Sequence, residues 1–443
     1  MKKSKKESKT LKSTLKQTSK EQKNSKNRQK KVLTKKIVLP ISILIIVILL
    51  VTLIVYAFTG KQKNTVVEAE KTELNLANNE YMHVEEDASG DKVPVPNGYV
   101  GSDAEGENEI DTGYVIYEGE EAVTDSNVAD AKKNRNQYVW VPVPDVSKFY
   151  GTDANGKKWG KLYSFTTGTN SSSLFDEETG TYPLNWSESN GVMTISSKTS
   201  YREPDYVKSY DYDSKLKTLG IGEEETHELS NQLEKEFNKM VESVEKYGGF
   251  YIGRYETGNI NQETPVVQKG NTNISSQTWY NMYKRCKNIK GDNTNVETGM
   301  IWENQWDRTL MWLIETGSKT KEQIADDSTS WGNYNNATFE YVNSSGSTAT
   351  KNENSSTRIP TGSTEYTKAN NIYDLAGNVW DWTMEAYGTR SRVCRGGYYY
   401  GSGDSYPAGD RNSYGYPTIS NDNIRLSFRT LHKVILNPGS DEL

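Results

Sequence analysis

The polarity pattern of the chain begins with a long hydrophobic segment. No residue from Ile37 to Gly60 is charged, and Ile, Leu and Val make up most of this segment. About 20 apolar residues in a helix span a hydrocarbon core of about 30 Å, so residues 37–59 predict one N-terminal transmembrane helix. A cleaved signal peptide is the alternative, but its apolar part usually has only about 7–15 residues.

Charge on either side of this segment predicts its orientation. Residues 1–36 contain 14 Lys and one Arg against two Glu, whereas the rest of the chain has 38 basic and 57 acidic residues. The positive-inside rule then predicts a cytoplasmic basic tail at 1–36 and an extracellular remainder, in a single-pass protein of the cell membrane. The tail fits an orientation signal near anionic lipid. No aromatic residues alternate with its charges, so we expect no nucleic-acid partner.

The segments that follow the membrane helix differ in composition. Residues 60–92 are charged, rich in Asn and Glu and without hydrophobic periodicity, and they predict a stalk. An N-terminal extension of the ectodomain is expected at 93–246. In it, short β-type segments at 114–117 and 138–143 are separated by acidic turns.

Apolar residues that recur every three or four positions predict three amphipathic helices. The first helix ends before Gly248, and a strand is expected at 250–256. Its apolar stripe consists of Leu229, Leu233, Phe237, Met240, Val241 and Val244. The second helix is expected from Ser276 to Cys286. The third carries Trp302, Trp306, Leu310 and Leu313. The pattern as a whole predicts an α+β fold that is irregular and loop-rich.

Composition narrows the classes of protein that remain. Ten Trp and 29 Tyr are inconsistent with a disordered ectodomain. Two cysteines, Cys286 and Cys394, do not make a disulfide scaffold; a single bridge is conceivable, but two buried free thiols are favoured. The three histidines lie far apart in the sequence, which argues against a histidine site for iron or zinc.

The C-terminal third carries four motifs in a characteristic order: Tyr373–Trp382 (YDLAGNVWDW), Arg392–Tyr398 (RVCRGGY), Arg411 and Ser427–Arg429 (SFR). Together they resemble the formylglycine-generating (sulfatase-modifying factor) family, whose fold is C-type lectin-like. Trp306 and Trp331–Asn333 match further family positions. The resemblance covers about 247–432, which leaves 433–443 as a C-terminal tail, and it implies a formylglycine-generating-enzyme-like fold for this region.

The resemblance also implies a structural calcium ion. The matching positions are the side chains of Asp374 and Asp381 and the carbonyl groups of Gly377 and Val379. Calcium prefers hard oxygen ligands, and this set mixes carboxylates with carbonyls on a tight loop. The alternative is that both carboxylates cap ordinary turns. The family's other calcium site would fall near Asn336 and Ala337, where its remaining ligands have no counterpart that can be aligned.

Catalysis is not expected from these residues. Family members that make formylglycine bind copper through two cysteines, four and nine residues after the second glycine of the Gly-Gly pair. Here those positions are Gly401 and Tyr406, so we expect neither copper nor iron. The fold therefore implies no enzymatic activity by itself. An enzyme with unrecognised chemistry and a structural cell-surface protein remain the alternatives.

A segment of Tyr, Ser, Gly, Asp and Asn at 398–423 replaces the catalytic residues. This composition is typical of antibody paratopes, so we predict that the segment binds an extracellular protein or glycan ligand. It also resembles the variable segment of retroelement-diversified proteins of this fold; a plain polar surface loop is the other interpretation. Arg411 could equally be a structural arginine paired with Asp410 or a carbonyl group. The predicted contact residues are Tyr398, Tyr399, Tyr400, Asp404, Tyr406, Arg411, Tyr414 and Tyr416.

Overall fold

The computed structural model describes one part of the chain. The described residues are 76–152, 156, 158–163, 181–182, 186–189, 192–195, 223–258, 265–272, 279–387, 391–415, 428–430 and 432–436. The chain divides into two compact units, residues 1–70 and 71–443, and every described residue belongs to the second. The predicted tail at 1–36 and membrane helix at 37–59 lie outside the described residues. Within them, no helix has the length and hydropathy of a membrane span.

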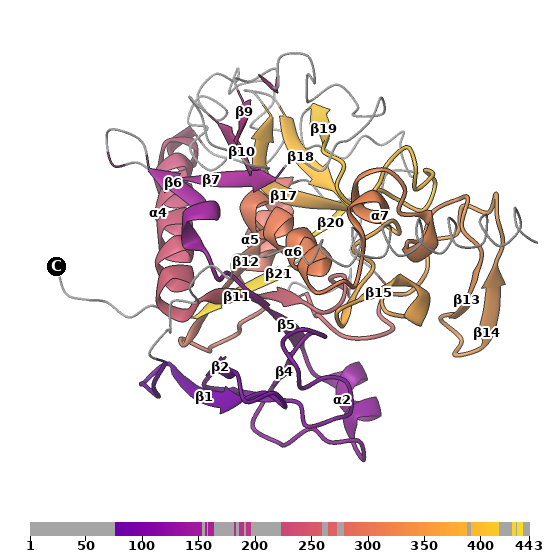
Figure 1. Cartoon of the computed structure of the whole chain (residues 1–443), viewed down its shortest axis with the longest axis horizontal. Helices are drawn as coiled ribbons and strands as arrows, with labels where there is room; N and C mark the ends of the chain where they lie inside the picture. The colour runs from indigo at the N-terminus through magenta and orange to yellow at the C-terminus, as the bar shows by residue number, and fades with distance from the viewer. Residues whose placement is uncertain are drawn as a thin grey trace, which may run out of the picture. The chain divides into compact units, whose positions relative to one another are not determined.

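A six-stranded antiparallel sheet forms the centre of the second unit, in the order β12-β21-β11-β5-β4-β3 (Figure 1). Its strands are β3 (Tyr99–Gly101), β4 (Val115–Glu118), β5 (Gln137–Pro142), β11 (Gly249–Gly253), β12 (Val296–Met300) and β21 (His432–Leu436). Side chains along a strand point alternately to opposite faces of the sheet. In β5, Val139 and Val141 enter one hydrophobic cluster, whereas Tyr138 and Trp140 enter another. The sheet is therefore buried on both faces.

Three helices contribute to the first cluster: α4 (Glu223–Tyr247), α5 (Trp279–Cys286) and α6 (Glu303–Glu315). Phe237 of α4, Met282 of α5 and Leu310 of α6 are buried there. These are the three helices that the three- and four-residue spacing predicts, and that prediction is confirmed. The opposite face packs against a hairpin of β1 (Met82–Glu86) and β2 (Lys92–Pro96), through Met82 and Val95.

Three predicted boundaries need correction. The tail expected at 433–443 begins later, because β21 (His432–Leu436) extends into it and pairs with β11 and β12 in the central sheet. The stalk expected to extend to residue 92 ends earlier, because β1 and β2 already belong to the folded unit and Met82 is buried. The boundary expected at residue 247 does not separate two folding units either. β11 pairs with β5 along its whole length, from Gly249–Pro142 to Gly253–Tyr138. Backbone pairing across this position joins the N-terminal extension to the C-terminal region.

A second sheet carries the C-terminal motifs, in the order β19-β18-β17-β20. Its strands are β17 (Trp380–Tyr387), β18 (Ser391–Arg395), β19 (Asn412–Gly415) and β20 (Phe428–Thr430), and only the β17–β20 pair is parallel. A third sheet lies within the N-terminal extension expected at 93–246. Its strands are β6 (Tyr150–Thr152), β7 (Lys158–Tyr163), β10 (Val192–Ile195), β9 (Trp186–Ser189) and β8 (Thr181–Tyr182).

The remaining described elements are short. Two hairpins pair β13 (Phe339–Val342) with β14 (Thr348–Lys351) and β15 (Lys368–Ala369) with β16 (Ile372–Tyr373). The short helices are α2 (Val128–Asn134), α7 (Lys321–Ala325), η1 (Val146–Lys148), η5 (Thr329–Trp331) and η6 (Glu365–Thr367). Long connections link these elements, as expected for an α+β, loop-rich fold.

Candidate functional site

The loop between β18 and β19 holds most of the predicted ligand contacts, and two glycines begin it. Gly396 and Gly397 have φ values of 89° and 77°, a region that side chains disfavour. A Cβ on Gly397 would lie 2.3 Å from the Tyr406 carbonyl oxygen. The Gly-Gly motif therefore allows the chain to leave β18 while the far end of the loop packs against it.

Backbone hydrogen bonds anchor this loop, residues 398–411, to two other segments. The Tyr399 N–H donates to the Asn378 carbonyl at 3.0 Å. The Asn335 N–H donates to the Gly401 carbonyl at 2.9 Å, and the Ser328 N–H donates to the Gly403 carbonyl at 3.1 Å. The loop is thus fixed at intervals along its length, which limits the conformations available to its side chains.

An aromatic cluster of Trp380, Tyr398 and Tyr406 lies under the loop. Tyr398 stacks on Trp380 with ring centroids 5.4 Å apart, and Tyr406 meets Trp380 edge to face at 5.6 Å. Gly401 lies between the tyrosines, since a Cβ there would be 2.7 Å from the Tyr406 ring and 2.8 Å from the Tyr398 ring. The two positions that hold copper-binding cysteines in the resembled enzymes are therefore adjacent here, and an aromatic cluster surrounds them.

Other predicted contacts face solvent. Tyr400 is 39% exposed, Asp404 is exposed and Tyr399 is half-buried. Tyr398 and Tyr406 are also half-buried, but both pack against the hydrophobic core. Tyr414 belongs to β19, where only its backbone is described, and Tyr416 lies outside the described residues.

Arg411 is buried in an ion-pair network. Its guanidinium donates to Asp307 Oδ2 at 2.7 Å, while Arg395 donates to Asp307 Oδ1 at 2.7 Å. The Arg411 side chain is only 5% exposed, and those of Asp307 and Arg395 are fully buried. This placement corrects the expectation that Arg411 contacts ligand. It corresponds to the structural alternative, with Asp307 of α6 as a carboxylate partner.

Asp307 is the residue of this region that the sequence analysis missed. It follows Trp306 in α6, a helix in which both polar and apolar side chains are buried. The position of Asp307 in a helix that is expected to be buried could have indicated an ion-pair partner, because Asp is rarely fully buried unless it is paired. Nothing in the local spacing, however, identifies two arginines that lie 88 and 104 residues further along the chain.

Asp374 begins the predicted calcium loop and is fully buried. Its backbone adopts a φ of 61°, and its carboxyl group accepts hydrogen bonds from the Gly362 N–H at 2.8 Å and the Thr367 hydroxyl at 2.7 Å. Burial raises the pKa of Asp374 to about 6. Asp381, in β17, is also fully buried, and burial together with the nearby Asp374 raises its pKa well above the ordinary value.

The turn between these two carboxyl groups, in the 373–382 motif, contacts Asn333 of the 331–333 motif. Gly377 has a φ of 74°, and a Cβ there would lie 2.4 Å from the Asn333 carbonyl oxygen. The amide group of Asn378 accepts a hydrogen bond from Asn333 at 2.9 Å and donates to Glu256 at 2.7 Å. Asn333 and Glu256 therefore both hold the turn in place through hydrogen bonds to the Asn378 side chain.

The ligand chemistry of this loop fits calcium only if carbonyl oxygens take part. Among the described residues, no group of three or more His, Cys, Asp or Glu side chains is placed to hold a metal ion. The predicted set contains two such side chains and two carbonyl groups. Two fully buried carboxyl groups on either side of one tight turn are consistent with a hard cation that would offset their charge.

The two cysteines are buried and unbridged, as expected. Burial raises the pKa of the Cys394 thiol well above its ordinary value. A thiol that stays protonated is a poor nucleophile and metal ligand. The prediction of two buried free thiols is confirmed.

Comparison with known proteins gives a family match for part of the C-terminal region. Residues 314–433 match the model of the sulfatase-modifying factor enzyme 1-like domain. The family resemblance that the motifs carry is thereby confirmed for this segment, which begins near the end of α6 and extends into β21. A search of the curated proteins gives no match.

Two solved structures align with 43% of this chain, each at 13% sequence identity. PvdO from Pseudomonas aeruginosa is covered to 82% with a TM-score of 0.27, and Treponema denticola variable protein 1 is covered to 96% with a TM-score of 0.23. These scores are too low to support an inference from either structure. The assignment therefore rests on the family model and the motifs.

Proposed function

We propose that this protein is a membrane-anchored, non-catalytic binding protein that presents residues 398–406 to an extracellular protein or glycan ligand. One observation carries this proposal. Gly401 and Tyr406 occupy the positions of the copper-binding cysteines, and the Tyr406 ring packs with Trp380 and Tyr398. Neither residue supplies a thiolate, and the aromatic rings occupy the surrounding space.

The exposed side chains of the loop support a binding role. Tyr399, Tyr400 and Asp404 reach solvent from a backbone that other segments hold in place. Tyrosine offers a large amphipathic contact area at low cost in conformational entropy, and a preorganised loop loses less entropy on binding. We infer that these three residues contact ligand, while Tyr398, Tyr406 and Arg411 support the loop from beneath.

Alanine substitution of all three residues tests this role. The full chain is applied to arrays of glycans and of extracellular proteins, and its binding is compared with that of a Tyr399→Ala, Tyr400→Ala, Asp404→Ala variant. Interface hot spots contribute about 2 kcal/mol or more each, so we expect binding to fall at least tenfold. Val342→Ala is the matched control, because Val342 is 47% exposed and lies on a different hairpin. Equal binding by the triple variant would contradict the proposal.

A direct assay tests whether the protein converts cysteine to formylglycine, as the resembled enzymes do. The purified chain is incubated with copper and a cysteine-containing peptide, and the peptide mass and bound copper are measured. We expect no conversion of cysteine to formylglycine and no stoichiometric copper. Product formation would show that the protein is an enzyme, and one tightly bound copper per chain would contradict the expectation that it binds no copper.

We also propose that Asp374 and Asp381, with the carbonyl groups of Gly377 and Val379, hold a structural calcium ion. Ligand binding stabilises the folded state by about 2.7 kcal/mol at a concentration of 100 times Kd. Calcium should therefore raise the Tm above its value in EDTA, and Asp381→Asn should abolish this difference. Asp404→Asn, at an exposed carboxyl group, is the control. A wild-type Tm that is identical in EDTA and calcium would contradict the site.

We further propose that a retroelement diversifies the coding region for residues 398–423. The composition of this segment supports it, as does the placement of its exposed side chains on an anchored backbone. Sequencing the coding region in related strains is the test. We expect substitutions to concentrate at adenine positions of 398–423 and to be rare in the β13–β14 hairpin. An even distribution over both segments would contradict diversification.

A further inference from the structure

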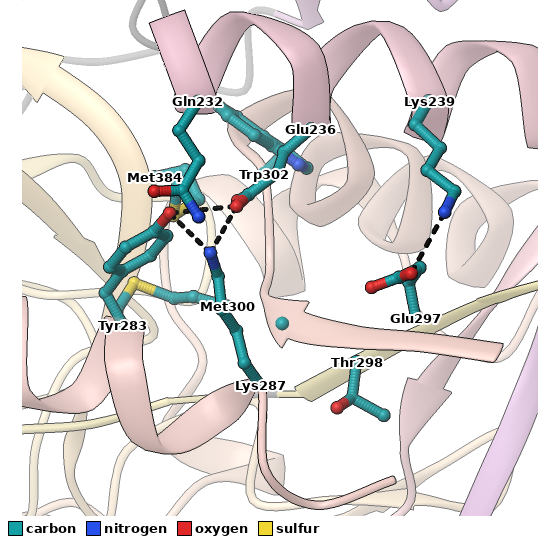
Figure 2. Close-up of a pocket in the computed structure, with 11 residues that line it drawn as sticks. Gln232, Glu236, Lys239, Tyr283, Lys287, Glu297, Thr298, Met300, Trp302 and Met384 are labelled. Carbon is teal, nitrogen blue, oxygen red and sulfur yellow. Dashed lines mark hydrogen bonds and ion pairs between the residues drawn. The ribbon is translucent and has the colours of Figure 1, made fainter. Parts of the chain in front are cut away.

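A pocket lies outside the 398–411 loop and the calcium loop. It has a volume of about 190 Å³ and lies between α4, the end of α5 and β12 (Figure 2). None of the predicted contact or calcium residues lines it. Pockets for drug-sized ligands have volumes of about 300–1,000 Å³, so this volume suits a smaller occupant.

The pocket has an apolar floor. Met300, Trp302 and Met384 line it, and each is at most 1% exposed. Methionine side chains are flexible and polarisable, so they adapt to apolar groups of different shape. Such a floor accommodates a hydrocarbon or aromatic body and offers little to a strongly hydrated ligand.

Two lysines, Lys287 and Lys239, line the pocket wall. The Lys287 ammonium donates to the Tyr283 hydroxyl at 2.7 Å and pairs with Glu236, and Figure 2 shows these three groups as a triangle. At the other end, Lys239 pairs with Glu297 at 2.9 Å. An ammonium has three donors. Among the described residues, Lys287 uses two of them, on Tyr283 and Glu236, which leaves one N–H for a ligand.

The local charge balance favours an anionic ligand. Lys239 and Lys290 share the Glu297 carboxylate, because the Lys290 ammonium lies 3.7 Å from it. Two lysines and two glutamates line the pocket, and Lys290, outside the lining, adds a third ammonium group beside Glu297. Their side chains are 25–41% exposed, so the ammonium groups remain accessible from solvent.

We propose that this pocket binds a small monocarboxylate with an apolar body. The Lys287 ammonium donates to the ligand carboxylate, and Met300, Trp302 and Met384 contact the apolar part. Tyr283 and Glu236 hold the Lys287 side chain in place through their hydrogen bonds. The site is independent of the proposed extracellular ligand of residues 398–406.

Calorimetric titration of the full chain with phenylacetate tests this site, with phenylacetamide as the neutral compound of matched shape. We expect saturable binding of phenylacetate and at least tenfold weaker binding of phenylacetamide. Loss of a hydrogen bond to a charged group should lower the affinity about tenfold in Lys287→Met. Lys133→Met is the control, because Lys133 is exposed on α2 and does not line the pocket.

Lys287→Gln, which retains a polar side chain of similar length, provides a second variant whose folding is checked by its Tm. An equal affinity for phenylacetate and phenylacetamide would overturn the proposal. Wild-type affinity in both Lys287 variants would overturn it as well. A dipeptide ending in phenylalanine that binds tenfold more tightly than phenylacetate would identify a polypeptide C-terminus as the occupant, and would also overturn it.

Discussion

At the scale of single residues, one carboxylate joins three sequence motifs. Asp307 lies in α6, Arg395 in the strand before the Gly-Gly pair, and Arg411 at the end of the 398–411 loop. A buried carboxylate that accepts from two guanidinium groups fixes the distances between these elements. Arg395 and Arg411 thus maintain the site and do not form its surface.

Substitution of Asp307 by Asn should be strongly destabilising. It would leave two guanidinium groups buried without their anion, and breaking a buried ion pair costs about 3–5 kcal/mol. Urea unfolding of the purified variant measures the change. Glu315→Gln is the matched control, because Glu315 pairs with Arg308 but is 46% exposed, and a change below about 1 kcal/mol is expected. Equal effects of the two substitutions would contradict the structural role of Asp307.

At the scale of secondary-structure elements, a second buried ion pair joins distant strands. Glu107, between β3 and β4, contacts Arg254, at the end of β11, at 2.7 Å and Lys132 of α2 at 2.7 Å. Burial alone would raise the pKa of Glu107, but Arg254 and Lys132 outweigh it and lower this pKa from 4.5 to about 2. The elements on the two sides of residue 247 are therefore tied by charge as well as by backbone pairing.

This pKa predicts how stability depends on pH. Because the pKa in the folded state lies below its unfolded value, the unfolded chain binds more protons between pH 4.5 and pH 2. The contribution of Glu107 is fully present above pH 4.5 and is lost as the pH falls through 2. Glu107→Gln should flatten the pH dependence of the free energy of unfolding in this window, whereas the exposed Glu353→Gln should not. Parallel curves for wild type and Glu107→Gln would contradict this assignment.

At the scale of the whole molecule, the region that resembles the family is not an independent domain. β11 lies between β5 and β21 in the central sheet, so a chain that begins at residue 247 would lose β5. It would also expose β11 backbone groups and leave Arg254 without Glu107. We expect residues 71–443 to unfold cooperatively in denaturant. Residues 247–443 should give no cooperative transition, and a cooperative transition from this shorter chain would contradict the prediction.

Membrane attachment is the second prediction at this scale. We expect the full chain to sediment with membranes and to resist alkaline extraction, because the apolar segment at 37–59 is long enough to span a bilayer. Deletion of 37–59 should release the protein into the soluble fraction. Recovery of an ectodomain that begins shortly after residue 57 would instead identify a cleaved signal peptide.

Elements whose signals are local could be predicted from the sequence. Three- and four-residue spacing predicted α4, α5 and α6, and short β-type segments predicted β4 and β5. Glycines and aromatic residues at fixed positions identified the family motifs, because close backbone approaches such as those at Gly377 and Gly397 exclude a side chain. These features depend on a few neighbouring residues and are therefore visible in one dimension.

Which residues of the candidate site are accessible depends on tertiary packing and could not be predicted from the sequence. Tyr398, Tyr400 and Tyr406 occur in one polar segment with the same local signal, yet Tyr398 and Tyr406 pack on Trp380 and Tyr400 faces solvent. Arg411 is buried because Asp307, about a hundred residues earlier, accepts from it. Burial depends on contacts between segments far apart in the chain, and these contacts leave no periodic pattern in the sequence.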